Sequence, residues 1–354
     1  MEPRTDKRCE APASKGKVLY FEWARCLGAA SVVMIHVTSG IMDNHTIPEV
    51  GVIRALIWSE MQVALLRWAV PVFFMMTGAL LLDPRKEVTW RRVWGYVRWM
   101  LLVLCTWGLS FCLMQRFFTE RSFSLTLIAG SVLDLLSGKG FSHLWYIYAL
   151  IGVYLLLPVL RAWVATAGDR EQRTLLWVLF AFTCVVPTVN SAFGLELSTF
   201  LWLSSSVFYV FLGRYAHEKL DLDCKLLAIG IASVIACMAL KAYGILAVGD
   251  YWKWLHGPSC PLEAVWSLCV FLLMKRWLDC QYRKGGAVER LATLSLGIYI
   301  VHPLFINFLY KAFGMGPWSL PPVIFESVCW TVSFLGSIML ASISKRTPLM
   351  RSFM

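Results

Sequence analysis

Residues 18–40 read VLYFEWARCLGAASVVMIHVTSG, an apolar stretch that nevertheless contains Glu22, Arg25 and His36. A helix of roughly 20 apolar residues is long enough to cross the ~30 Å hydrocarbon layer of a bilayer. An ionisable group inside such a helix is costly unless it is paired or hydrated. The stretch therefore predicts a membrane-spanning helix whose three ionisable side chains face the protein interior.

The spacing of these residues adds detail. Arg25 and His36 are separated by almost three helical turns, or about 16 Å along the axis, so they share one face. Glu22 precedes Arg25 by one turn, and the two side chains can neutralise each other. Two interpretations stay open at this point: a polar functional face, or an interfacial salt bridge with His36 bonded to a nearby carbonyl.

Composition extends the same conclusion to the whole chain. Of 354 residues, 58% are hydrophobic and 16% charged, and the mean hydropathy is +0.63, whereas a soluble domain is about one-quarter charged. We expect an all-α, polytopic integral membrane protein with about ten transmembrane helices. The predicted spans are 18–40, 68–82, 93–115, 144–166, 174–193, 197–213, 225–247, 261–277, 291–312 and 321–343.

The distribution of charge predicts the topology. Residues 1–17 are basic without an apolar core, which is typical of a cytoplasmic tail and not of a signal peptide. An N-terminus inside places most of the 33 basic residues on the cytoplasmic side. We expect a cytoplasmic tail over 1–17, one transmembrane domain over 18–343, and a cytoplasmic tail over 344–354. The net charge of +11 then favours anionic lipid as a partner and not nucleic acid.

Two apolar outer segments precede spans. They are Val52 to Arg67, before the second span, and Leu125 to Leu136, within the connection before the fourth. Such segments can lie in the membrane interface. Either they cover an outward-facing cavity or they only anchor the bundle.

Two further histidines fall near the same predicted level as His36. His143 opens the fourth span, and His302 precedes Pro303 in the ninth, where a proline frees a backbone carbonyl. Histidine is the usual proton acceptor near neutral pH. We therefore expect His36 to act as a general base or as a transient acyl carrier, and His143 and His302 to orient it or to be structural.

A basic cluster leads into the third span. Arg91, Arg92 and Arg98 could bind the phosphates of an acyl-CoA, because guanidinium groups bind phosphate in bidentate fashion. The alternative is an ordinary positive-inside loop. The eleven cysteines show no metal-binding spacing, so we expect no metal site.

Taken in order, these motifs resemble the membrane-bound acyltransferase-3 family, whose bacterial members O-acylate surface polysaccharides. The likeness rests on Arg25 and His36 with Glu22, on PVFFMMTG at 71–78, on HLWY at 143–146 and on IYIVHP at 298–303. Thr77 stands where that family usually has Ser. The arginines at the third span stand farther apart than in the family pattern, which puts their individual roles in doubt.

The resemblance implies an activity: O-acyl transfer, most simply O-acetyl transfer, to a hydroxyl of a surface glycan or lipid-linked sugar. Acetyl-CoA or another acyl-CoA would be the co-substrate on the cytoplasmic face, with no bound cofactor, in a bacterial cytoplasmic (inner) membrane. It also implies catalysis by His36 with Glu22 and Arg25, and donor binding by Arg91, Arg92 and Arg98. The supporting residues would be Thr77, His143, Trp145, Tyr146 and His302, with Thr77 or Tyr146 stabilising the tetrahedral charge.

A transporter or flippase of a small polar solute or lipid-linked sugar is the alternative function. The same intramembrane Glu, Arg and His side chains could then form a substrate or proton path. The absence of an internal repeat in the sequence counts against this class. The acceptor, the acyl length and the oligomeric state are left open by the sequence.

Overall fold

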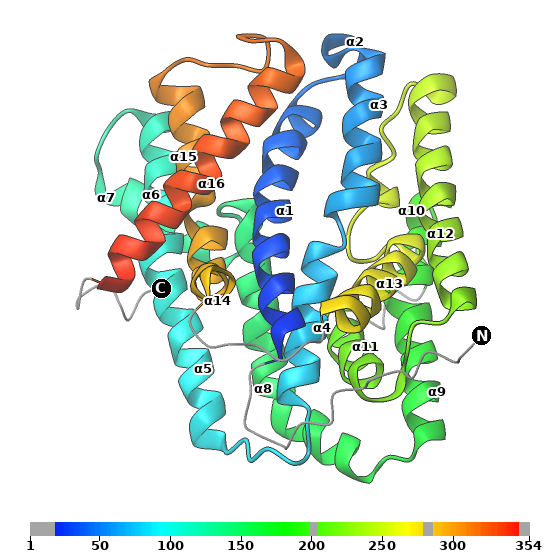
Figure 1. The fold of residues 1–354 in the computed structure, drawn as a ribbon. Coiled ribbons are helices and arrows are strands. Elements are labelled where there is room, and N and C mark those ends of the chain that lie inside the picture. The colour runs from blue at the N-terminus through cyan, green and yellow to red at the C-terminus, as the bar shows by residue number, and fades with distance from the viewer. Residues whose placement is uncertain (1–17, 198–203, 279–285, 347–354) are drawn as a thin grey trace.

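The computed structural model describes residues 18–197, 204–278 and 286–346, and every regular element within them is helical (Figure 1). The first half of the chain forms α1 (Leu19–Asn44), α2 (Ile47–Val50), α3 (Val52–Met61), η1 (Gln62–Leu66), α4 (Ala69–Leu81), α5 (Trp90–Val103), η2 (Leu104–Gly108), α6 (Leu109–Glu120), α7 (Leu125–Leu136), η3 (Ser142–Leu144) and α8 (Trp145–Thr166). The second half forms α9 (Asp169–Phe180), η4 (Ala181–Val185), α10 (Val186–Phe193), α11 (Ser205–Lys219), α12 (Cys224–Tyr243), η5 (Gly244–Val248), η6 (Lys253–Leu255), α13 (Pro261–Leu278), α14 (Ala287–Ala292), α15 (Ser295–Ala312) and α16 (Pro322–Arg346).

Seven helical stretches in the described ranges are long and apolar enough to cross a membrane. They are Leu19–Met42, Val52–Leu81, Trp90–Glu120, Ser142–Thr166, Asp169–Phe193, Cys224–Val248 and Val323–Arg346. This confirms the predicted all-α, multi-span architecture. The other three predicted spans overlap α11, α13 and α15, which are shorter or more polar. The count of ten and the cytoplasmic termini therefore stay predictions.

The predicted tails lie almost wholly outside the described residues. The tail over 1–17 falls in an undescribed range, as do residues 347–354. Residues 344–346 of the predicted C-terminal tail are the last residues of α16.

The second span is longer than predicted. The segment from Val52 to Arg67 is not a separate interfacial piece: α3 and the π-helical turn η1 run into α4, giving an apolar stretch from Val52 to Leu81. The reason is packing, because Trp58, Val63 and Leu66 are buried in the bundle. By contrast, α7 forms the predicted separate helix, with Leu125 and Leu136 largely exposed.

The first helix occupies the middle of the bundle (Figure 1). It packs against α4, α13, α15 and α16, so its polar side chains meet several other elements. The tightest pairing elsewhere is between α4 and α11, where Gly78 and Gly213 let the two backbones approach. Small residues permit such close helix contacts in membranes. This arrangement surrounds the residues of α1 that the sequence singles out.

Candidate active site

Three histidines from distant parts of the chain gather in the interior. His36 comes from α1, His143 from the turn η3 that leads into α8, and His302 from α15. The ring centroids of His36 and His302 are 4.9 Å apart, those of His143 and His302 5.5 Å, and those of His36 and His143 6.0 Å. The predicted residue and its two predicted companions therefore form one cluster.

The three rings differ in exposure. His302 is fully buried and His143 nearly so, whereas His36 is half-buried. His302 Nδ1 lies 3.2 Å from the Ile298 carbonyl oxygen, and Tyr299 donates its hydroxyl to the His143 carbonyl. The Nε2 atoms of His143 and His302 are buried without a hydrogen-bond partner among the described residues. Since an unmatched buried polar atom is costly, the cluster is suited to a bound polar group or solvent.

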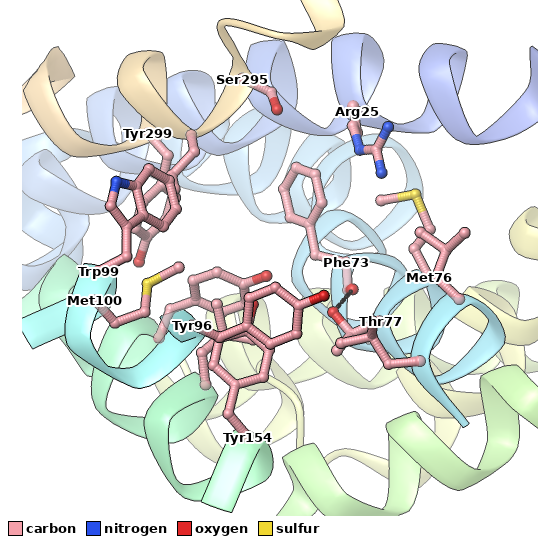
Figure 2. Close-up of a pocket in the computed structure, with 15 residues that line it drawn as sticks. Arg25, Phe73, Met76, Thr77, Tyr96, Trp99, Met100, Tyr154, Ser295 and Tyr299 are labelled. Carbon is pink, nitrogen blue, oxygen red and sulfur yellow. Dashed lines mark hydrogen bonds between the residues drawn. The ribbon is translucent and has the colours of Figure 1, made fainter. Parts of the chain in front are cut away.

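One cavity of about 350 Å³ is lined by Arg25, in the first part of α1 (Figure 2). We name it the Arg25 cavity. Figure 2 shows Arg25 and Ser295 on one side of it and Tyr96 and Tyr154 on the other. Its walls come from α1, α4, α5, α8 and α15, and its lining includes Arg25, Phe73, Met76, Thr77, Tyr96, Trp99, Met100, Tyr146, Tyr154, Ser295 and Tyr299. Three predicted site residues, Arg25, Thr77 and Tyr146, thus face one space.

The polar side chains of this cavity differ in whether they already form hydrogen bonds within the protein. Arg25 donates to Glu22 Oε1 at 2.8 Å, as the one-turn spacing predicts, and Glu22 is buried. Thr77 already donates its hydroxyl hydrogen to the Phe73 carbonyl at 3.0 Å, so it is poorly placed to stabilise developing negative charge. The Tyr146 hydroxyl has no hydrogen-bond partner among the described residues and is the better donor of the two.

A second cavity, of about 230 Å³, is lined by His36 of the cluster. We name it the His36 cavity. Its walls come from α1, the start of α4, Trp145 of α8 and the loop before α13, and its lining is Val32, Ile35, His36, Arg67, Val70, Pro71, Trp145, Gly257, Pro258 and Tyr299. The predicted residues His36 and Trp145 therefore face this space.

The two cavities share one lining residue, the aromatic Tyr299. Its ring centroid lies 5.2 Å from that of Tyr146, which in turn lies 6.2 Å from Phe73. It also lies 5.9 Å from the ring of His143 and 6.1 Å from that of His302. Tyr299 therefore lies beside the histidine cluster and contacts both spaces.

Comparison with known proteins gives the family. A family model described as an acyltransferase domain matches residues 18–344. The chain belongs to the acyltransferase-3 family. Similar curated proteins include the probable poly-beta-1,6-N-acetyl-D-glucosamine export proteins of Staphylococcus aureus strains MSSA476, MW2 and N315, each 22% identical over 301 residues, which is 81% of this chain and 82% of the relative. No solved structure matches the chain significantly.

In this member of the family, the predicted arginine cluster lines neither cavity. Arg91, Arg92 and Arg98 are exposed on α5, and Arg92 donates to the Glu87 carbonyl at 2.9 Å. The same helix turns Tyr96 and Trp99 into the Arg25 cavity. The three arginines therefore lie on faces of α5 other than the one that carries Tyr96 and Trp99. Donor binding by these arginines stays a prediction, and it would involve a part of the donor outside the cavity.

Sequence reasoning missed the loop that forms one wall of the His36 cavity. Lys241 donates to the carbonyls of Tyr251 and Trp252 at 3.1 and 2.9 Å, and its Nζ lies 2.6 Å from His256 Nδ1. Burial lowers the pKa of His256, so its neutral ring can accept this hydrogen bond. His256 therefore helps to hold this loop against the bundle.

His217 of α11 also contacts the first helix: its Nδ1 is 2.6 Å from the Tyr20 hydroxyl of α1. Arg67, which the sequence did not single out, lines the His36 cavity, as does Tyr299 of the IYIVHP motif. The only signal for Arg67 was a basic residue four positions before the PVFFMMTG motif.

Proposed function

We propose that the protein is an acyl-CoA-dependent O-acyltransferase, most simply an O-acetyltransferase, that acylates a hydroxyl of an extracytoplasmic or lipid-linked glycan. The family supports acyl transfer. The observation that carries the finer proposal is the position of His36: it lines one cavity, and Tyr299 beside it lines both. A donor and an acceptor entering from opposite sides would meet at that point.

The donor would occupy the Arg25 cavity. Arg25 lies about 16 Å below His36 along α1, a distance that an extended pantetheine arm can bridge. The lining of Trp99, Met100 and Phe73 suits the arm's carbon chain, while Arg25, held by Glu22, would face the polar end. The charged nucleotide would remain at the cytoplasmic surface, where the exposed arginines of α5 lie.

The acceptor would occupy the His36 cavity. In the proposed step, a neutral His36 nitrogen takes the proton of the acceptor hydroxyl as the oxygen attacks the thioester carbonyl. The C–O bond forms, the tetrahedral intermediate collapses and the C–S bond breaks. The thiolate of CoA then receives the proton from the His36 imidazolium, so the products are an ester and free CoA. Tyr146 is positioned to donate to the oxyanion.

His36→Ala tests this proposal. Loss of a general base typically lowers a rate by ~10²–10⁴-fold, and we expect glycan acylation, measured by mass spectrometry of the isolated glycan, to fall by at least ~100-fold. His45→Ala is the matched control, because His45 packs edge-on against Trp318, with ring centroids 4.6 Å apart, and lines neither cavity. Unchanged acylation by a correctly inserted His36→Ala protein would refute the catalytic role.

Export is the second candidate function, because the curated relatives are named as export proteins. Two cavities that share the aromatic residue Tyr299 are also compatible with alternating access to a polar solute. Purified protein in liposomes separates the two candidates. Acyl-CoA consumption coupled to acylation of an enclosed sugar supports the transferase, whereas sugar movement without acyl-CoA consumption supports the exporter.

A further inference from the structure

Arg67 brings a positive charge into the His36 cavity. The residue lies between η1 and α4, lines the cavity and is partly exposed. Its Nη2 donates to Ser39 Oγ at 3.0 Å. Because Ser39 follows His36 by three residues on α1, the guanidinium lies roughly one turn, or about 4.5 Å of helix rise, beyond the His36 position.

The guanidinium is held by neutral groups. Arg67 donates from Nε and Nη2 to Gln62 Oε1 at 3.2 and 2.7 Å, and Gln62 in turn donates to Thr38 Oγ1 at 2.7 Å. These contacts fix the orientation of the side chain without neutralising its charge. Among the described residues no carboxylate forms an ion pair with Arg67.

Two buried arginines of the bundle are paired with carboxylates. Arg54 pairs with Glu326 at 2.7 Å, and Arg214 pairs with Glu218 at 2.7 Å. The buried Lys241, in contrast, is held by backbone carbonyls and His256. Glu263 interacts electrostatically with Arg67, but its Oε2 accepts from the Gly257 amide at 2.9 Å. Because Arg67 is partly exposed in the cavity and forms no ion pair among the described residues, its charge is available to an anion from outside the chain.

The volume of the cavity limits the size of the molecule that can carry this anion into it. A volume of about 230 Å³ is below the ~300–1,000 Å³ of clefts that hold drug-sized ligands. It admits a single sugar ring or a similar polar group. Trp145 at the wall offers an aromatic face for such a ring.

We propose that Arg67 is a specificity-determining residue that binds an anionic group, a carboxylate or a phosphate, on the acceptor sugar next to the hydroxyl to be acylated. This inference rests on the proposed function, since it assigns the acceptor to the His36 cavity. Guanidinium groups bind carboxylate and phosphate through charge-assisted hydrogen bonds. Nε and Nη2 of Arg67 already donate to Gln62 and Ser39, so Nη1 is the nitrogen left to bind the anion. A neutral sugar would leave the charge of Arg67 unmatched and would bind more weakly.

Chemical labelling of His36 tests the proposal without requiring turnover. The purified protein in nanodiscs is treated with diethyl pyrocarbonate, and modification of His36 is followed by peptide mass spectrometry. D-glucuronate, glucose 6-phosphate and glucose are compared at equal concentration and ionic strength. We expect at least one of the two anionic sugars to slow labelling threefold or more and glucose to have little effect. Which anionic sugar protects tells whether the acceptor carries a carboxylate or a phosphate.

Variants of Arg67 test whether this residue causes the protection of His36 from labelling. Arg67→Gln is expected to lose the protection, Arg67→Lys to keep part of it, and Arg121→Gln, which removes an exposed charge, to retain all of it. Equal protection by all three sugars, protection by none, or anionic protection that survives in Arg67→Gln would overturn the proposal. If Arg67→Gln does not fold, the comparison of charged and neutral sugars in the wild type and in Arg67→Lys still decides. His36→Ala acylation is scored separately, so failure of one proposal is distinguishable from failure of the other.

Discussion

Asp83 shows how one carboxylate can stabilise the connection between two spans. It follows α4, is nearly buried, and accepts from Arg85 Nε at 2.9 Å and Nη2 at 3.1 Å. Arg214 of α11 lies 4.0 Å away. Arg161 of α8 donates to the Asp83 carbonyl at 2.9 Å, so two other helices, α8 and α11, contact this connection. The hydrogen bonds from Arg85, with the positive charges of Arg85 and Arg214, hold the pKa of Asp83 below its usual value.

This pKa shift predicts a pH dependence of stability. A carboxyl group whose pKa is lower in the folded protein contributes stability above its unfolded pKa of ~3.9 and loses it as pH falls through the folded value. We expect thermal stability in detergent to decline below about pH 4, and Asp83→Asn to show a smaller decline over that range. Asp221→Asn, at a side chain 98% exposed, serves as the control. Identical pH profiles for wild type and Asp83→Asn would contradict the assignment.

At the scale of elements, the contact between α4 and α11 depends on two glycines. A Cβ added at Gly78 would lie 1.7 Å from the Val210 carbonyl oxygen, and one at Gly213 would lie 2.1 Å from that of Met75. Backbone atoms cannot move aside as a flexible side chain can. The two helices would have to separate to admit even one methyl group.

We therefore expect Gly78→Ala to lower the free energy of unfolding by about 1–3 kcal/mol or more, as overpacking does. Gly95→Ala is the matched control, because a Cβ at Gly95 of α5 meets nothing within 4 Å. There the substitution should be neutral, or stabilising by up to ~1 kcal/mol through helix propensity. Unfolding of both variants by denaturant in detergent checks the difference, and equal stability of the two would show that the helices adapt.

Sequence patterns predicted the existence of the helices better than their extents. The long apolar runs, such as residues 18–40, coincide with helices because length and hydrophobicity suffice to predict a span. The segment before α4 was misjudged, because only tertiary packing shows that Trp58 and Val63 are buried and that η1 joins α3 to α4 without a loop. Likewise, no local pattern shows that Gly78 meets Val210.

At the scale of the whole molecule, the sequence placed His36, His143 and His302 at a similar depth but could not show contact. Their meeting depends on how α1, α8 and α15 pack, which has no local signature. Arg67 escaped notice for the same reason, since it looks ordinary in its own segment, and the IYIVHP motif did not show that its Tyr299 lines a cavity. The role of each site residue stays a prediction until variants are measured.

Orientation is a property of the whole bundle that the positive-inside pattern predicts. An epitope inserted after Gly138, in the connection between α7 and η3, should bind antibody on intact spheroplasts. One inserted after Gly168, between α8 and α9, should bind only after the membrane is permeabilised. Gly138 has a positive φ and open space around it, so the insertion there disturbs no packing. The reverse labelling pattern would place the N-terminus outside.

Tyr299 also bears on how well the membrane maintains a proton gradient, because its side chain lines both cavities. If the two cavities open to opposite sides of the membrane, the Tyr299 ring would lie between two water-filled spaces. Loss of that ring would then let protons leak across the membrane and dissipate the proton-motive force. Tyr299→Ala in liposomes should collapse an imposed pH gradient, as reported by an enclosed pH-sensitive dye, whereas Tyr299→Phe should maintain it. A gradient that survives Tyr299→Ala would mean that other side chains form the seal. A bulky aromatic side chain at this position would thus block proton leakage across the membrane as well as line the two cavities.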